Sequence, residues 1–177
     1  MLKSNFIKSG LFLFFVILAF YVVAQKENIP TTENFTVEGK VKKGLTVSLE
    51  DLSAYTSYFI DSIVITNHLG ERKSTLKNVK AVLLKDILTK VEIDSENPKV
   101  LSEFYFTCIA SDNYKVVFSW NEIFNNPAGN SVYIITGQDG KPATALDNRI
   151  ALVSPKDQMT GRRYVKGLQK IIVERVK

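Results

Sequence analysis

The chain has 177 residues, with 23 lysines and arginines, 18 aspartates and glutamates, one histidine and one cysteine. That length predicts one domain with a core of its own, and 45% hydrophobic with 23% charged residues argue against disorder. A single cysteine excludes an internal disulfide, a CxxC redox pair and a cysteine-rich zinc site, and a single histidine excludes a multi-histidine metal cage.

Residues 1–24 have the pattern of a signal peptide. Lys3 and Lys8 form a basic head, and an apolar run of 14 residues follows from Leu11 to Ala24. A membrane-spanning helix needs roughly 20 apolar residues, so the short run favours cleavage after Ala24 and export to the periplasm or the extracellular space. The alternative is an uncleaved segment, which would then be the chain's contact with the membrane.

The basic charge of the chain comes partly from this first segment. Residues 1–24 carry two lysines and no acidic residue, so their removal lowers the net charge from +5 to +3. The remaining basic residues occur at most in pairs and are interleaved with acids, without a stacking motif beside them. Nucleic acid is therefore not an expected partner.

The rest of the chain predicts a single, mainly β domain. Residues 25–33 are polar and contain Pro30, which indicates a linker before a domain at 34–177. Apolar alternation or β-branched runs predict strands at 35–41, 45–49, 58–66, 104–110, 114–118, 132–136, 149–153 and 167–176. The polar stretch 67–80 is predicted as a loop or hairpin. Many short strands with one or two helices indicate an α+β fold.

Three short segments have helical signals. Leu84, Ile87 and Leu88 lie on one face of the most amphipathic segment, which predicts a helix at 82–91. Ser48 with Asp51 three residues later predicts the start of a short helix, and 121–124 is a further short candidate.

His68 and Cys108 are the candidates for chemistry by residue type. His68 follows a predicted strand together with Asn67, at a place where loops often carry function. Taken alone, a solvated loop histidine is the preferred interpretation. Cys108 lies mid-strand on the face of Phe104 and Phe106, which predicts a buried thiol that acts as a small hydrophobe.

Two turns supply the remaining candidates. Arg162, Arg163 and Lys166 follow Gly161 and could hold a phosphate, although a solvated basic turn explains them as well. Asp112 and Tyr114 flank Asn113, a residue that suits a positive-φ position in a tight turn. The sequence has no metal-ligand spacing, phosphate-binding loop or dinucleotide fingerprint.

Six motifs in one order resemble the molybdopterin-binding domain of the sulfite oxidase family, in its small single-domain bacterial form. They are FTVEGKV (35–41), LTVSLEDL (45–52), VKAVLLKDIL (79–88), ASDNYKV (110–116), RIALVSPKD (149–157) and RYVKGLQKIIV (163–173). The resemblance implies a sulfite-oxidase-type α+β fold. It also implies a molybdenum cofactor, held through a pterin dithiolene and one cysteine thiolate, that serves oxygen-atom transfer or reduction.

The resemblance assigns roles residue by residue. The family's ligand cysteine falls near Asn67 and His68, where this sequence has no cysteine. Arg163 and Lys166 match the C-terminal basic motif that holds the pterin phosphate, and Arg149 matches a further basic position. The turn with Asp112 and Tyr114 borders the family's pocket. The residues predicted to bind a cofactor are Asn67, His68, Asp112, Tyr114, Arg149, Arg162, Arg163 and Lys166, and no residue is predicted as a metal ligand.

Three functions follow as hypotheses. The first is an exported, non-catalytic module that binds a small molecule, a pterin or a partner protein of the envelope; the missing thiolate ligand favours it. The second is a molybdopterin-dependent oxidoreductase with a non-cysteine metal environment, which would take electrons from an envelope redox partner. The third is a structural envelope protein, because a fold alone does not set a function.

Overall fold

A computed structural model describes residues 29–177 of the protein. The predicted signal peptide at 1–24 and the first residues of the predicted linker lie outside the described residues. The described part of that linker lies against the domain. The Ser111 hydroxyl donates a hydrogen bond to the carbonyl oxygen of Pro30 at 2.6 Å, and Thr32 forms a parallel bridge with Arg149. The chain is therefore attached to the domain from Pro30 onward.

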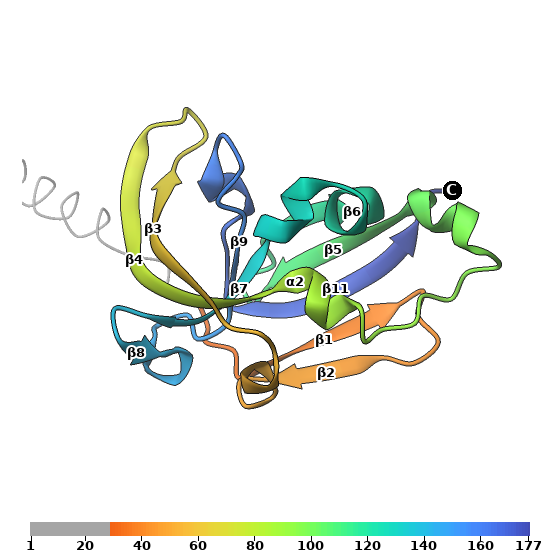
Figure 1. Ribbon diagram of the computed structural model, residues 1–177, viewed down its shortest axis with the longest axis horizontal. Helices are drawn as coiled ribbons and strands as arrows, with labels where there is room; N and C mark the ends of the chain where they lie inside the picture. The colour runs from red at the N-terminus through yellow and green to blue at the C-terminus, as the bar shows by residue number, and fades with distance from the viewer. Residues whose placement is uncertain (1–28) are drawn as a thin grey trace, which may run out of the picture.

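The first of two sheets has five strands in the order β2-β1-β11-β5-β6 (Figure 1). Its strands are β1 (Asn34–Gly39), β2 (Leu45–Ser48), β5 (Phe104–Ala110), β6 (Lys115–Ser119) and β11 (Leu168–Arg175). β1 and β11, the first and last strands of the domain, pair in parallel near the centre of the sheet. All five strands were predicted from the alternation of apolar residues, to within two residues at either end.

The second sheet has six antiparallel strands, five of them in the order β10-β9-β7-β4-β3 with β8 paired to β7. Its strands are β3 (Tyr58–Thr66), β4 (Arg72–Leu83), β7 (Tyr133–Gln138), β8 (Lys141–Pro142), β9 (Ala151–Val153) and β10 (Val165–Lys166). The prediction of a loop at 67–80 is wrong for most of its length, because β4 begins at Arg72. The hairpin alternative is right, since β3 and β4 pair with each other.

The helices are short. They are α2 (Leu84–Leu88), α3 (Trp120–Phe124) and the 3-10 turns η1 (Asp51–Ala54), η2 (Pro98–Glu103), η3 (Pro127–Ser131), η4 (Ala143–Ala145) and η5 (Thr160–Arg163). The predicted helix at 82–91 is thus only five residues long, because its first two residues complete β4. In the stretch from 29 to 177, no helix is long and apolar enough to cross a bilayer.

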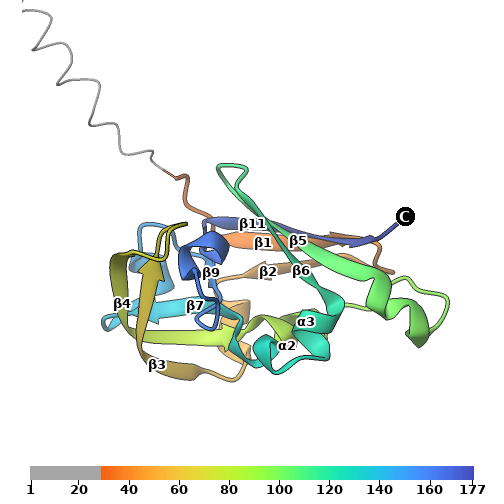
Figure 2. The same ribbon diagram turned by 90° about the horizontal axis from the view of Figure 1, so that it is seen from above.

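The core occupies the space between the first sheet and the elements that cover it. Figure 2 shows α2 and α3 on one face of that sheet. Phe35, Phe106 and Phe118 from the sheet pack with Ile87 of α2 and Ile123 of α3, all nearly inaccessible to solvent. A smaller hydrophobic cluster is formed by buried residues of β3, β4, β7 and β9 in the second sheet. The prediction of one small, mainly β domain with few helices is confirmed.

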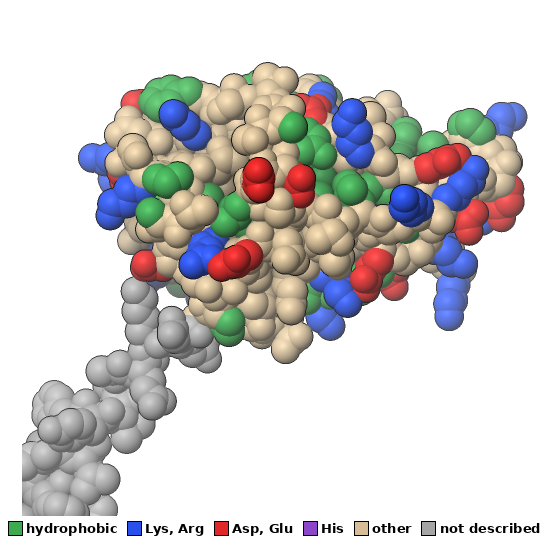
Figure 3. Space-filling view, turned by 90° about the horizontal axis from the view of Figure 1, so that it is seen from below, with side chains coloured by type: hydrophobic (Ala, Val, Ile, Leu, Met, Phe, Trp, Pro, Cys, Tyr) green, Lys and Arg blue, Asp and Glu red, His purple; other side chains and the backbone are tan. Residues whose placement is uncertain are grey.

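The surface carries charges of both signs. On the face shown in Figure 3, basic and acidic side chains are intermixed, with small apolar areas between them. This is the mixed charge of an ordinary folded domain surface.

Candidate functional site

The end of β3 lies directly against η5, and this junction brings distant parts of the chain together. The hydroxyl of Thr160 donates to the carbonyl oxygen of Val64 at 2.6 Å and accepts from the amide of Thr66 at 3.0 Å. A Cβ on Gly161 would lie only 2.0 Å from the Thr66 carbonyl oxygen, so only glycine permits this approach. The β3–β4 turn, which begins at Asn67, therefore starts beside the basic turn.

The side chain of Asn67 forms hydrogen bonds within the β3–β4 turn. Its Oδ1 accepts hydrogen bonds from the amides of Leu69 and Glu71, both at 2.9 Å, and its Nδ2 donates to the Glu71 carboxylate at 2.8 Å. His68 next to it is exposed to solvent. Asn67 thus stabilises the turn, and His68 has the solvated position that was preferred for it.

The turn between β5 and β6 contacts η5 through Tyr114. The Tyr114 hydroxyl donates to the carbonyl oxygen of Arg162 at 2.6 Å, and the Asp112 carboxylate accepts from the Tyr114 amide at 2.9 Å. Asn113 has a φ of 67°, the positive value that the sequence predicted. The structure therefore brings Tyr114 and Arg162 together, while Asp112 serves the turn.

Arg163 is held by two carboxylates. Its Nε and Nη2 donate to the two oxygens of Asp157 at 2.7 and 2.6 Å, and its Nη1 donates to Glu122 at 2.9 Å. The guanidinium also lies 4.2 Å from the ring centre of Phe118. The hydrogen bonds that Arg163 donates to Asp157 and Glu122 outweigh burial and raise the pKa of Arg163 above its ordinary value. Both anionic partners were missed by the sequence analysis.

The other predicted cations have different partners. Arg149 pairs with Glu33 and lines a pocket of about 320 Å³ together with Tyr164. The Lys166 ammonium lies 5.3 Å from the ring centre of that same Tyr164, and Arg162 is exposed. Two of the four basic residues therefore have acidic partners and one lies over a tyrosine ring, which leaves Arg162 as the exposed cation of the set.

Cys108 is completely buried in the core of the first sheet, as its position in the sequence predicted. Burial raises the pKa of its thiol to about 12 and outweighs the opposing effect of the Arg163 charge. Among residues 29–177, no three histidine, cysteine, aspartate or glutamate side chains gather into a group that could hold a metal ion.

We expect Cys108 to be unreactive in the folded protein. At pH 8, modification by an aromatic disulfide reagent should be about a thousandfold slower than that of an exposed cysteine, because both access and thiolate are missing. Ser57→Cys adds an exposed thiol as the internal standard. Release of thiolate followed by absorbance should show one fast thiol in that variant and none in the natural protein until denaturant is added. Rapid native labelling would contradict the buried position.

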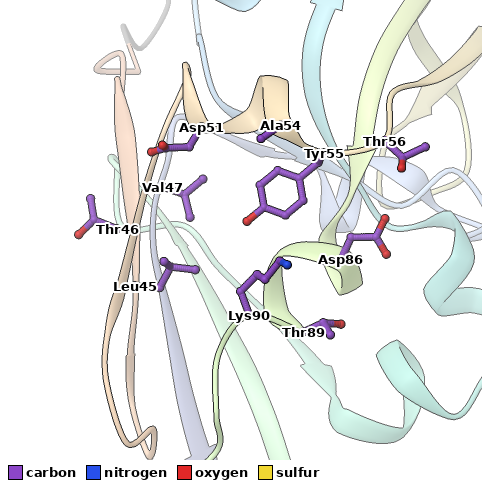
Figure 4. A pocket seen from close by; sticks show the side chains of 10 residues that line it. All are labelled: Leu45, Thr46, Val47, Asp51, Ala54, Tyr55, Thr56, Asp86, Thr89 and Lys90. Atoms are coloured by element: carbon purple, nitrogen blue, oxygen red, sulfur yellow. The ribbon is translucent and has the colours of Figure 1, made fainter.

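A separate groove of about 540 Å³ lies between β2, the segment after η1 and α2 (Figure 4). It is lined by Leu45, Thr46, Val47, Asp51, Ala54, Tyr55, Thr56, Asp86, Thr89 and Lys90. None of the eight predicted site residues belongs to it. The spacing of Asp86 and Lys90, four residues apart at one end of the predicted helix, was a signal in the sequence that could have indicated it.

Comparison with known proteins supports the fold. No family model and no curated protein sequence matches the chain. Among solved structures, the sulfane dehydrogenase SoxCD from Paracoccus pantotrophus is similar with a TM-score of 0.61 and 14% sequence identity. The match covers 82% of this chain and 40% of that one. The two proteins share a fold, and the chain spans well under half of the length of its structural neighbour.

Proposed function

We propose that the protein is an exported, non-catalytic module that binds a small ligand on a sulfite-oxidase-like fold, without a molybdenum cofactor. The observation that carries this proposal is the environment of Arg163. The family resemblance gives this cation the task of holding a pterin phosphate. Its three donor nitrogens instead meet Asp157 and Glu122, and a phosphate placed there would face two carboxylates.

The residues present do not fit the molybdenum cofactor. The family's chemistry needs a protein thiolate at the metal, and the one thiol of this chain is buried at Cys108. Asn67, near the position of the family's cysteine, has both ends of its amide engaged in the turn. These contacts support a scaffold in which residues at the family's cofactor positions bond to the protein itself.

The similarity to sulfane dehydrogenase supports the sulfite-oxidase-like fold and carries no activity, because the identity is 14%. Export is proposed from the basic head and apolar run at 1–24, which are typical of a signal peptide. The exported protein would then bind its ligand in the periplasm or outside the cell.

The test is a cofactor analysis of the protein purified from its native host. We expect a mature chain that begins at Gln25 by mass spectrometry, with neither molybdenum by elemental analysis nor pterin by fluorescence after oxidation. A molybdoenzyme purified from the same cells serves as the control for cofactor synthesis. Stoichiometric molybdenum and pterin would overturn the proposal and favour the oxidoreductase; Lys166→Ala would then test the predicted phosphate contact through cofactor retention.

A further inference from the structure

The groove between β2 and α2 has the size and lining of a small-molecule site. Its volume of about 540 Å³ lies within the range of roughly 300 to 1,000 Å³ that is common for such sites. Leu45, Val47 and Ala54 supply an apolar wall, and Val47 is only 1% exposed. The opposite wall carries the polar side chains of α2 and the residues that follow it (Figure 4).

Tyr55 supplies a flat, half-buried surface with a hydroxyl at one end. Burial raises the pKa of Tyr55, and the negative charges of Asp51 and Asp86 raise it further. The hydroxyl therefore stays protonated and can donate a hydrogen bond. Tyrosine suits ligand sites because its ring packs on apolar groups while its hydroxyl makes a directed hydrogen bond.

Asp86 and Lys90 carry opposite charges and both belong to the lining of the groove, but they form no ion pair with each other. Residues four apart can pair along a helix, yet the ion pairs and side-chain hydrogen bonds within residues 29–177 include neither Asp86 nor Lys90. Asp51, the other carboxylate of the lining, is by contrast engaged by the Ser48 amide and hydroxyl at 2.8 and 2.7 Å. The groove thus offers a ligand one carboxylate and one ammonium group that have no partner among residues 29–177, while Asp51 adds a negative charge that already accepts hydrogen bonds.

We infer that this groove binds a small zwitterion with an apolar body, of the class of a free amino acid with a large apolar side chain. Its ammonium meets Asp86, its carboxylate meets Lys90, and its apolar body packs on Tyr55 and Val47. This inference rests on the proposed small-ligand function and names the ligand class. A ligand with both charges is favoured over a singly charged one, because either alone leaves one protein charge unanswered.

The test is a titration of the isotope-labelled mature protein, followed by amide chemical shifts. The probes are L-phenylalanine, 3-phenylpropionate, which lacks the ammonium, and phenethylamine, which lacks the carboxylate. We expect saturable shifts confined to residues 45–56 and 84–90 with L-phenylalanine. Each analogue should bind about tenfold more weakly, since each loses one charge-assisted contact.

Variants separate the two charges. Asp86→Asn should weaken L-phenylalanine about tenfold and remove the preference over 3-phenylpropionate, whereas Lys90→Gln should remove the preference over phenethylamine. Asp61→Asn and Lys80→Gln make the same charge changes at exposed positions outside the groove and should leave binding unchanged. Unperturbed amide spectra away from the groove confirm that the variants are folded.

Three results would overturn the inference. They are the absence of saturable shifts at 10 mM probe (about the weakest affinity worth a site), equal binding of all three probes, and shifts that map outside the groove. Failure here is distinct from failure of the proposed function, which the molybdenum and pterin analysis decides by itself.

Discussion

Replacing Arg163 with alanine is expected to lower the free energy of unfolding by about 2 to 3 kcal/mol, at the lower end of the loss seen when one partner of a buried ion pair is removed. The side chains of Arg163 and Asp157 are 24% and 17% exposed, while that of Glu122 is 41% exposed. The variant leaves two neighbouring carboxylates without their cation. Because Glu122 is partly solvated, the loss should fall below the largest values for fully buried pairs.

The same substitution should change the response of the protein to acid. Burial opposes ionisation of Glu122, but hydrogen bonds from Ser119 and Arg163 outweigh it and hold the pKa below its ordinary value of 4.5. A depressed carboxyl pKa stabilises the folded state above the ordinary value, and that contribution is lost as the pH falls through the folded pKa. Without Arg163 the folded pKa rises toward the ordinary value and this pH-dependent contribution shrinks, so the difference in stability between the natural protein and the variant should narrow as the pH falls from about 7 to about 3. Urea unfolding followed by circular dichroism from pH 3 to 7 measures both effects.

Two controls distinguish this structural role from a ligand-binding one. Arg162→Ala removes the adjacent, exposed cation and should change stability by less than about 0.5 kcal/mol. Arg163→Lys keeps the charge but loses the paired contact with Asp157, so its stability should lie between those of the natural protein and Arg163→Ala. Unchanged stability of Arg163→Ala would mean that the guanidinium is free for a phosphate, as the family resemblance implied.

The strands were predictable where burial repeats every second residue. In β5 the residues from Phe104 to Ala110 alternate strictly between buried and partly exposed positions, and the sequence shows that period directly. The first half of β4 has few buried residues, because the β3–β4 ribbon extends past the core. Its strand conformation comes from pairing with β3, which no local pattern in 72–80 reveals.

The candidate site was predictable by residue type and not by partner. The basic turn at Arg163 is visible in the sequence, and Ser119 with Glu122 has the spacing of a helix capping box. That Glu122 also reaches Arg163, 41 residues away, depends on how α3 packs against η5. The groove has the same limit, since Tyr55 and Lys90 approach only when β2 and α2 pack together.

The junction between β3 and η5 should be the other position of high cost. In Gly161→Ala the new Cβ would lie 2.0 Å from the Thr66 carbonyl oxygen, a backbone atom fixed by the sheet. We expect a loss of about 2 kcal/mol or more, because overpacking that requires backbone shifts is among the costlier substitutions. Gly44→Ala is the comparison and should lose less, since its Cβ would lie 3.3 Å from the carbonyl oxygen of Val37, a tight contact that a shift of a few tenths of an ångström relieves.

The contacts at this junction also predict which amides lose protection from hydrogen exchange in Gly161→Ala. The Thr66 amide donates to the Thr160 hydroxyl, so moving η5 away from β3 breaks this bond first. Hydrogen exchange at Thr66 should therefore accelerate by about tenfold or more beyond the global change in stability. Because Arg162 and Tyr114 meet across the same turn, the shift should reach the β5–β6 turn as well. An exchange rate at Thr66 that only follows global unfolding would mean that η5 moves with β3 as one unit, and that the approach at Gly161 does not hold the two together.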